Sequence, residues 1–213
     1  MLITDTRLKT ISSHLQQQLG REITLMTANE LGVLKAAPPG LRILCSSSPE
    51  LDYPFTVLPK HVVPCGPIIR AVQSTGFETS DLQHWLSRGP TVLVNLGTHL
   101  TVDATEGIEM AKAFHDLFKD ALESRYGTEL QILWKLKRKP GSVSTDDTNR
   151  TKSPNSFTGP WKGIRDILGH KMDEDRVRIT DWLTVEPKSV LESGHVICSV
   201  HHGGASSFNE AIW

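Results

Sequence analysis

The residue types best suited to binding chemistry are concentrated in residues 196–213, whose sequence is VICSVHHGGASSFNEAIW. An apolar, β-branched run leads into His201 and His202, two glycines follow, and residues 208–213 favour a helix. A strand that passes through a glycine turn into a helix is how α/β proteins build a phosphate site. Glycine lets the backbone approach the ligand, and the first helical turn presents free N–H groups. Residues 196–213 therefore predict a site for a phosphate-bearing ligand.

Other kinds of site fit these residues less well. A metal site at His201 and His202 is disfavoured, because adjacent residues on a strand point to opposite faces and no carboxylate stands at ligand spacing. The sequence has neither G-x-G-x-x-G nor G-x-x-x-x-G-K-S/T, so it lacks the fingerprints of dehydrogenases and P-loop proteins. The plain alternative is a structural strand, turn and helix in some other α/β protein.

The composition is that of an ordinary globular protein without a strong charge. The chain has 213 residues, of which 38% are hydrophobic and 22% charged, and its formal net charge is −1. This balance gives no overall attraction to nucleic acid or to an anionic membrane, so local groups must hold any anionic ligand. We therefore expect no nucleic-acid partner.

Cysteine content and apolar runs indicate the compartment. Cys45, Cys65 and Cys198 are an odd number without C-x-x-C spacing, so the sequence predicts neither a disulfide framework nor a zinc site. Residues 1–20 lack the apolar core of a signal peptide, and no run approaches the roughly 18 apolar residues of a membrane span. We expect a cytoplasmic protein without a membrane span.

The second half of the chain alternates between strand and helix patterns. Residues 91–96 form a continuous apolar run that is typical of a buried parallel strand, and the turn Gly97-Thr98-His99 follows. Further strands are expected at 131–137, 177–183 and 196–200, and helices at 104–124, 161–168 and 188–192. This order predicts a doubly wound α/β domain with right-handed crossovers. Thr98 could alternatively serve only to cap the helix that begins at 104.

The first half carries weaker signals. Apolar residues at helical spacing predict an amphipathic helix at 5–19. Residues 51–69 contain four prolines, which exclude a regular helix and favour an extended connector at a domain boundary. The remaining expectations are a weak helix at 27–34, a strand at 41–45, a short helix at 82–86 and a mobile surface loop at 135–155.

Four segments of the sequence together resemble one known family. Residues 200–211, VHHGGASSFNEA, resemble the donor-binding signature H-x-G-x-x-S-x-x-E-A of the family-one, UDP-sugar-dependent glycosyltransferases, and the doubled His and doubled Gly are most similar to the fungal branch. Three more segments agree in order and spacing: Cys65-Gly66-Pro67-Ile68 with the G-P that opens the interdomain linker, Val92–Thr98 with the first strand and turn of the donor domain, and Asp181–Leu191 with W-x-P-Q-x-x-V-L.

The resemblance implies a GT-B fold, in which two Rossmann-like domains bind the acceptor and the UDP-sugar donor. On this pattern, residues 1–64 would be the remnant of an N-terminal acceptor domain and 65–89 the interdomain linker. Residues 90–213 would be an incomplete, doubly wound donor-binding domain. We expect this polypeptide to be truncated at both ends relative to the family.

The resemblance also implies a role for each site residue. Thr98 would contact phosphate from the first turn, and Trp182 would stack on uracil. His202 and the backbone at Gly204 would meet the diphosphate. A helix N-terminus with a His donor beside it can stabilise a diphosphate leaving group without a metal, so we expect no metal and no cofactor other than the donor itself.

The remaining site residues lie on the last helix. Ser206 and Ser207 would add hydroxyl donors, and Glu210 would accept hydrogen bonds from the ribose hydroxyls. Ser206 stands where the family usually has Asn, and Lys188 where it has Gln, so the donor sugar is not fixed by these motifs. The implied reaction is inverting transfer of a hexosyl group, most simply from UDP-glucose, to a hydroxyl of a small lipophilic acceptor such as a sterol, polyketide or phenolic.

The sequence also departs from the family in ways that bear on activity. The family's catalytic base, a His in a P-x-x-G-H turn, has no counterpart here, since His14 lies in the 5–19 helix and His61 in the proline-rich connector. The G-V-P strand and D-Q motif expected beyond residue 213 are also missing. The alternative function is therefore a catalytically incompetent nucleotide-binding or interaction fragment. We expect poor folding, because the sheet would expose an edge and an apolar face.

Overall fold

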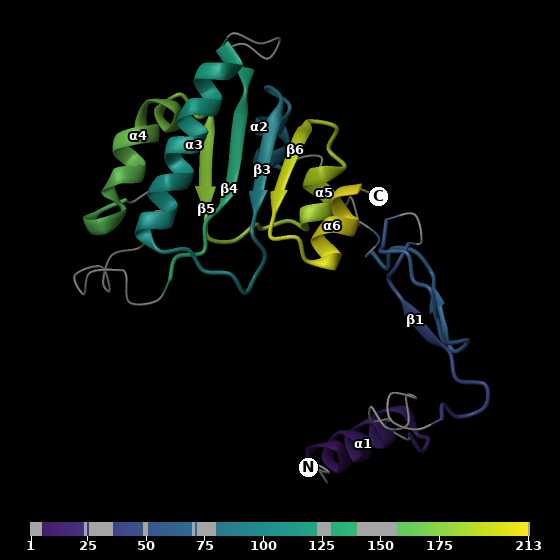
Figure 1. Cartoon of the computed structure of the whole chain (residues 1–213). Coiled ribbons are helices and arrows are strands. Elements are labelled where there is room, and N and C mark those ends of the chain that lie inside the picture. Colours follow the sequence, from purple (N-terminus) through teal and green to yellow (C-terminus); the bar gives the residue numbers. More distant parts are fainter. Residues whose placement is uncertain are drawn as a thin grey trace. The chain divides into compact units, whose positions relative to one another are not determined.

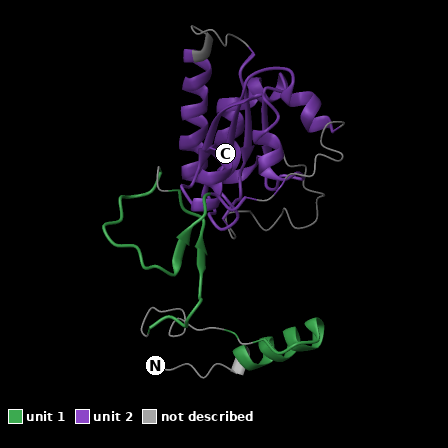
Figure 2. Cartoon of the chain, turned by 90° about the vertical axis from the view of Figure 1, so that its right-hand side faces the viewer, with its two compact units in different colours: residues 1–66 green, residues 67–213 purple. Residues whose placement is uncertain are grey.

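The computed structural model describes residues 6–23, 25, 36–48, 51–69, 71, 80–122, 129–139 and 157–212. The chain divides into two compact units, Met1–Gly66 and Pro67–Trp213 (Figure 2). No helix in the described ranges is both long and apolar enough to cross a membrane. The division falls within the segment that the sequence predicts as the start of the linker.

The first unit contains a helix and a small parallel sheet. Helix α1 covers Thr6–Leu19, as the spacing of its apolar residues predicts. Strands β1 (Ile43–Cys45) and β2 (Val62–Pro64) pair in parallel. The sequence missed β2 because of its prolines, but Pro64 lies at the end of a strand with a free edge, where its missing N–H costs no ladder bond. The weak helix expected at 27–34 lies outside the described residues.

The second unit contains a four-stranded parallel sheet with the order β5-β4-β3-β6 (Figure 1). The strands are β3 (Thr91–Asn95), β4 (Gln131–Lys135), β5 (Val177–Thr180) and β6 (Val196–His201). The helices are α2 (Asp81–Leu86), α3 (Ala104–Leu122), α4 (Lys162–Asp173), α5 (Pro187–Leu191) and α6 (Ala205–Ile212), and a 3₁₀ turn covers Gly159–Trp161. The predicted alternation of strand and helix is confirmed.

Both faces of this sheet are covered by helices, as in a doubly wound fold. Val92 and Val94 of β3 point into a core shared with α3 and α4, which contribute Phe114 and Ile164. Leu93, between the two valines, points into a second core on the opposite face. That second core also contains Leu133 of β4, Trp85 and Leu86 of α2, and Val190 of α5. Burial on both faces explains why the central residues of β3 and β4 are apolar without polar alternation.

The strand order creates a reversal next to β3. From β3 the chain proceeds outward through β4 and β5, and it then returns to place β6 on the other side of β3. The connections from β3 and from β6 therefore leave the sheet in opposite directions. In open α/β sheets, ligands bind outside the carboxyl ends of the strands at such a switch point.

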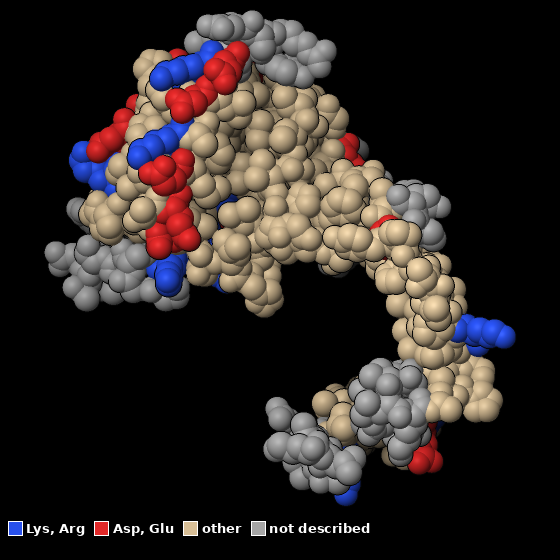
Figure 3. Space-filling model, in the orientation of Figure 1, with Lys and Arg blue, Asp and Glu red and all other residues tan. Residues whose placement is uncertain are grey.

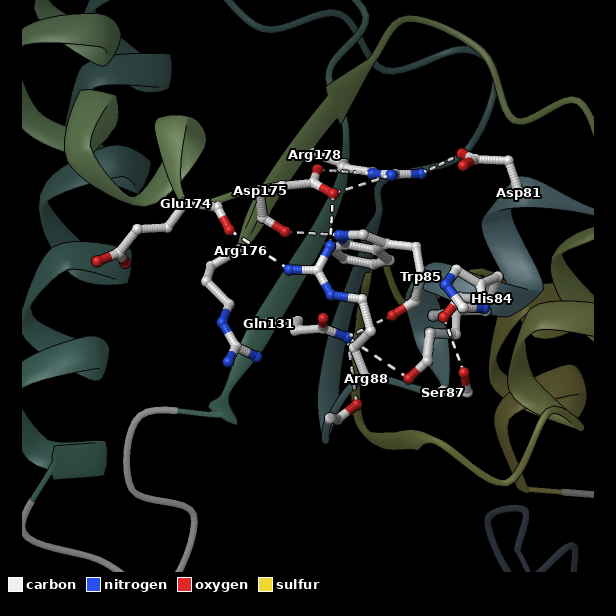
Figure 4. Close-up of polar contacts among 12 residues, drawn as sticks. Asp81, His84, Trp85, Ser87, Arg88, Gln131, Glu174, Asp175, Arg176 and Arg178 are labelled. Carbon is white, nitrogen blue, oxygen red and sulfur yellow. Dashed lines mark hydrogen bonds and ion pairs between the residues drawn. The ribbon is translucent and has the colours of Figure 1, made fainter.

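At the amino ends of the strands, hydrogen bonds and a cation–π contact join α2 to the sheet (Figure 4). Trp85 Nε1 donates to Asp175 O over 2.6 Å, and the Arg178 guanidinium lies 5.0 Å from the Trp85 ring centroid. The amide Nε2 of buried Gln131 donates to Trp85 O over 3.1 Å. Helix α2, which falls within the 65–89 linker of the sequence interpretation, is thus part of the core of the second unit.

Charged and apolar surfaces lie on different parts of the second unit. Over α3 and α4, acidic and basic side chains alternate and form ion pairs such as Lys112 with Glu109 and Lys162 with Asp166 (Figure 3). The surface over the edge strand β6 and helix α6 has few charges (Figure 3). Its exposed apolar side chains are Ile197, Val200, Phe208 and Ile212.

The largest differences from the sequence expectations are at three boundaries. The loop predicted at 135–155 is wrong at its start, because Lys135 and Leu136 are buried and Arg138 forms a bridge with Val102. The strand predicted at 177–183 ends at Thr180, where the Thr180 hydroxyl bonds to the backbone of the next turn. The helix predicted at 161–168 continues to Asp173. Residues 140–155 of the predicted loop lie outside the described residues.

Candidate functional site

The carboxyl ends of all four strands meet at one edge of the sheet. The strand register places Thr180, Lys135, Asn95 and His201 side by side in one row across β5, β4, β3 and β6. The turns that follow these residues therefore lie next to each other. The turns after β3 and β6 stand at the switch point, so this edge is where a ligand is expected from topology alone.

The imidazole of His202 occupies a slot between two glycines. A Cβ on Gly97, in the turn after β3, would stand 2.8 Å from Cδ2 and from Nε2 of His202. A Cβ on Gly204 would stand 2.2 Å from Cε1 of the same ring. Both distances are shorter than any real contact of a methyl group. Only glycine at these two positions leaves room for the ring, and Gly97 in addition has φ +85°.

Hydrogen bonds fix the orientation of this ring. The backbone N–H of Gly204 donates to His202 Nδ1 over 3.1 Å. Because a backbone N–H is always a donor, Nδ1 is the acceptor, and Nε2 carries the proton of the neutral ring. Nε2 lies 3.3 Å from the hydroxyl of Ser207. His202 is exposed and therefore presents an N–H donor at the surface of the site.

Helix α6 begins directly after the glycine turn. Its first backbone bond runs from Phe208 N–H to Gly204 O over 2.9 Å, so the N–H groups of residues 205–207 precede the helical ladder. Ser206 and Ser207 lie in this first turn. Glu210 is four residues after Ser206 and three after Ser207, which places it on the same side of the helix. No hydrogen bond joins Glu210 or Ser206 to the other site residues that the structure describes.

Trp182 lies in the turn after β5, at the far end of the row. It is 59% exposed, unlike Trp85, Trp134 and Trp161, which are buried. The hydroxyl of Thr180 donates to Trp182 O over 2.6 Å, and the N–H of Trp182 donates to the same hydroxyl over 3.3 Å. The backbone of Trp182 is therefore held in place while one large aromatic side chain is open to solvent.

Asn95 of β3 and Lys135 of β4 hold the turn that contains Gly97. Asn95 Oδ1 accepts from the Gly97 N–H over 3.2 Å, which is the bond of an Asx turn. Lys135 Nζ donates to Gly97 O over 3.1 Å, and Lys137 Nζ donates to Thr98 O. A trans peptide directs its N–H away from its C=O, so the N–H groups of residues 98 and 99 point away from the two lysines.

Lys135 also connects this turn to Trp182. Its Nζ lies 4.5 Å from the centroid of the Trp182 ring, within the range of a cation–π interaction. Burial, with a smaller effect from the charge of Lys137, lowers the pKa of the Lys135 ammonium from its ordinary value. In the described ranges, no group of three or more His, Cys, Asp or Glu side chains could hold a metal ion.

The structure brings most of the predicted site residues to this one edge. His202 contacts both Gly204 and Ser207, and Thr98 and Trp182 are linked to them through the turn at Gly97 and Lys135. The Gly204 N–H, expected to meet a ligand, is bonded to His202 here. Lys188, which departs from the sequence pattern, lies buried in α5 and pairs with Glu192 over 3.3 Å.

Sequence reasoning missed Asn95 and Lys135. Asn95 was counted as part of an apolar run, although Asn two residues before Gly is a signal for an Asx turn. Lys135 falls where the strand predicted at 131–137 overlaps the loop predicted at 135–155, and neither prediction indicates that its side chain is buried. The apolar residues on either side of Lys135, Trp134 and Leu136, are the signal that the strand continues to this point.

Comparison with known proteins adds an independent observation. No family model matches the chain. The chain is 40% identical over 185 residues to the glycosyltransferase sdnJ of Sordaria araneosa, an alignment that covers 86% of this chain and 32% of that protein. The chain thus spans about a third of the length of this relative.

A solved structure gives a weaker likeness. Os79 from O. sativa, in complex with UDP, matches with a TM-score of 0.35 and 19% identity, over 63% of this chain and 24% of that one. The sequence comparison shows that most of this chain is similar to part of a glycosyltransferase.

Proposed function

We propose that this chain binds a UDP-sugar and forms the donor-binding part of an inverting, family-one type glycosyltransferase with a GT-B fold. The observation that carries the proposal is the seating of His202 between Gly97 and Gly204 at the switch point of the sheet. This arrangement aims a His N–H donor and the first turn of α6 at the same edge. Phosphate oxygens are ligands that such groups bind.

The position of Trp182 supports a nucleotide over a simple phosphate. Neighbouring strands lie about 4.8 Å apart, so the ends of β5 and β6 are separated by about 14 Å. An extended nucleoside diphosphate can bridge this distance with its base at Trp182 and its phosphates at His202. The 40% identity to a glycosyltransferase supports sugar transfer as the use of that nucleotide.

Each residue has a role in this proposal. Trp182 stacks on uracil, Thr98 and the Gly204 turn hold phosphate oxygens, and Glu210 accepts from the ribose hydroxyls. Ser206 and Ser207 add hydroxyl donors. As the bond from the anomeric carbon to the diphosphate oxygen breaks, His202 and the positive end of α6 stabilise the growing charge on UDP, without a metal.

The transfer itself needs groups beyond the donor site. A base takes the proton of an acceptor hydroxyl, the oxygen attacks the anomeric carbon with inversion, and UDP leaves. The proposed donor is UDP-glucose, and the proposed acceptor is a small lipophilic alcohol such as a sterol, polyketide or phenolic. Cys45, Cys65 and Cys198 are free, which suits a reducing compartment such as the cytoplasm.

Nucleotide binding without transfer is the second candidate, and one observation favours it. The first unit has two histidines, His14 on α1 and His61 before β2. Within the described residues, no ion pair or hydrogen bond joins either of them to a carboxylate that could orient a base. On this proposal the 213-residue chain binds the donor but does not turn it over.

Isothermal titration with UDP, together with hydrolysis of UDP-glucose, tests both candidates. We expect UDP to bind with one site per chain and uridine to bind more weakly, because it lacks the phosphates. Hydrolysis of UDP-glucose above the buffer rate would support the transferase and exclude the binding-only candidate. Absence of UDP binding to folded protein would refute both.

A further inference from the structure

The ammonium group of Lys135 is buried at the ligand edge of the sheet. Lys135 is the last residue of β4 and is 6% exposed. Its Nζ donates to Gly97 O and faces the ring of Trp182. Among the residues that the structure describes, no carboxylate pairs with it. The side chain therefore links the turn after β3 to the turn after β5.

Burying a lysine side chain at this position costs free energy, because its ammonium group loses hydration. One carbonyl and one aromatic face return only part of the free energy of hydration that the charge loses. The lowered pKa of Lys135, caused first by burial, has the same origin. A methionine would occupy the same space without that loss, because it is unbranched and apolar. Stability alone therefore does not account for a lysine here.

The two contacts of Lys135 belong to the two halves of the proposed donor site. Trp182 is the platform for the base, and Gly97 lies in the turn that faces the phosphates. Resting on the function proposed above, we propose that Lys135 is a positioning residue, which fixes the Trp182 ring relative to the Gly97 turn so that one nucleotide engages both. It also keeps a positive charge at the strand ends, where the diphosphate binds.

Lys137 offers a matched control. It lies two residues further along the chain and donates to Thr98 O, so it contacts the same turn. It is exposed and makes no contact with Trp182 among the described interactions. Exposed interactions of this kind contribute little, so Lys137→Met should change the dissociation constant of UDP by less than about threefold.

The first test compares Lys135→Met with Lys137→Met and with the unmodified chain. We expect Lys135→Met to raise the dissociation constant of UDP about tenfold, since both a cation–π contact and a charge are lost. Its melting temperature should stay the same or rise, because a buried charge has been removed. A merely structural lysine would instead lower the melting temperature and the affinity together, and that result would overturn the proposal.

The second test needs no nucleotide. In a Trp213→Phe background, the tryptophans other than Trp182 are Trp85, Trp134 and Trp161, which are 2% exposed or less. Quenching by acrylamide then reports on Trp182. Release of its ring in Lys135→Met should increase the quenching constant of the free protein, whereas Lys137→Met should leave it unchanged. Equal quenching in all three proteins would overturn the proposal.

The two tests separate failure of this inference from failure of the proposed function. If the unmodified chain does not bind UDP, the proposed function fails, and the quenching experiment alone decides whether Lys135 positions Trp182. If the unmodified chain binds UDP and Lys135→Met binds it within twofold, the donor site stands and the role of Lys135 is refuted.

Discussion

A methyl group on Gly97 would stand 2.8 Å from both Cδ2 and Nε2 of His202, although the two residues are 105 positions apart in the chain. The contact exists because β3 and β6 are neighbours and their turns leave the sheet at the same edge. Two glycine turns that are far apart in the sequence therefore form a single site. The position of the His202 donor depends on the absence of a side chain at Gly97, in the turn after β3.

Replacement of Gly97 by alanine should therefore damage the site. The new methyl group displaces His202, and the φ of +85° adds a strain of about 1–2 kcal/mol for a residue with a Cβ. We expect the dissociation constant of UDP to rise at least about tenfold, which corresponds to about 1.4 kcal/mol of binding free energy. Isothermal titration measures this change, and chemical denaturation measures the accompanying loss of stability.

Gly194 is the control for backbone strain. Its φ is +80°, and a Cβ built on it meets no heavy atom within 4 Å. It precedes β6, at the end of the strand opposite to His202. Gly194→Ala should cost similar stability but leave UDP affinity unchanged. Equal losses of affinity in both variants would show that strain, and not the slot around His202, is responsible.

Trp182 should contribute to binding but little to stability. It is 59% exposed, so Trp182→Ala should change the free energy of unfolding by no more than about 0.5 kcal/mol. Stacking of a base on an aromatic ring is worth about 1–3 kcal/mol, so UDP affinity should fall roughly tenfold to 100-fold. Titration with pyrophosphate is the control, because this ligand has no base. An equal loss of pyrophosphate affinity would contradict the stacking role.

The fold could be predicted largely from sequence because its two central strands, β3 and β4, are buried on both faces. Residues 92–94 and 132–134 are apolar throughout, and such runs have few other places in a globular protein. The ends of elements were harder to locate. Thr180 ends β5 through a hydroxyl bond to the next turn, and a threonine gives no sign in sequence of whether it continues a strand or closes it.

The candidate site could be predicted only in part, because some of its groups are brought together by tertiary structure alone. The groups on α6 and the turn before it are close in sequence, so His202, Ser207 and Glu210 could be recognised together. Lys135 is joined to the site by strand register and by Trp182, both of which are tertiary. Lysine is also among the residue types least expected to be buried, so nothing in the sequence indicated that Lys135 lies inside the site.

Asp175 should make the stability of the second unit depend on pH in acid. Hydrogen bonds from Arg178 are the main cause of its lowered pKa, and Arg88 adds to the effect. Since the pKa is lower in the folded state, the stabilisation is complete above the ordinary value of about 3.9 and is lost as the pH falls through the lowered pKa. Asp175→Asn should remove this part of the acid dependence.

The exposure of the Asp175 side chain sets how much stability Asp175→Asn should lose. The Asp175 side chain is 43% exposed, so the loss at pH 7 should be about 1 kcal/mol, on the scale of surface ion pairs. Asn is the suitable replacement because Asp175 has φ +54°, a conformation that Asn tolerates and Ala does not. Urea denaturation at pH 7 and pH 3 measures the free energy of unfolding of the unmodified chain and of Asp175→Asn. If the difference between them is the same at both pH values, the ion pairs do not contribute as described.

The outer edge of β6 should make the protein prone to association. In the described sheet β6 pairs only with β3, and it exposes Ile197 by 45% and Val200 by 38%. An apolar strand with a free edge can pair with another chain, and a lysine on that edge opposes this. Ile197→Lys should therefore shift the chain towards monomer in light scattering at rising concentration, while the melting temperature measured at low concentration stays within a few degrees.

The same substitution at fully buried Ile132 should unfold the protein. If Ile197→Lys unfolds the chain as Ile132→Lys does, the edge of β6 is covered in solution and the expectation of association is wrong.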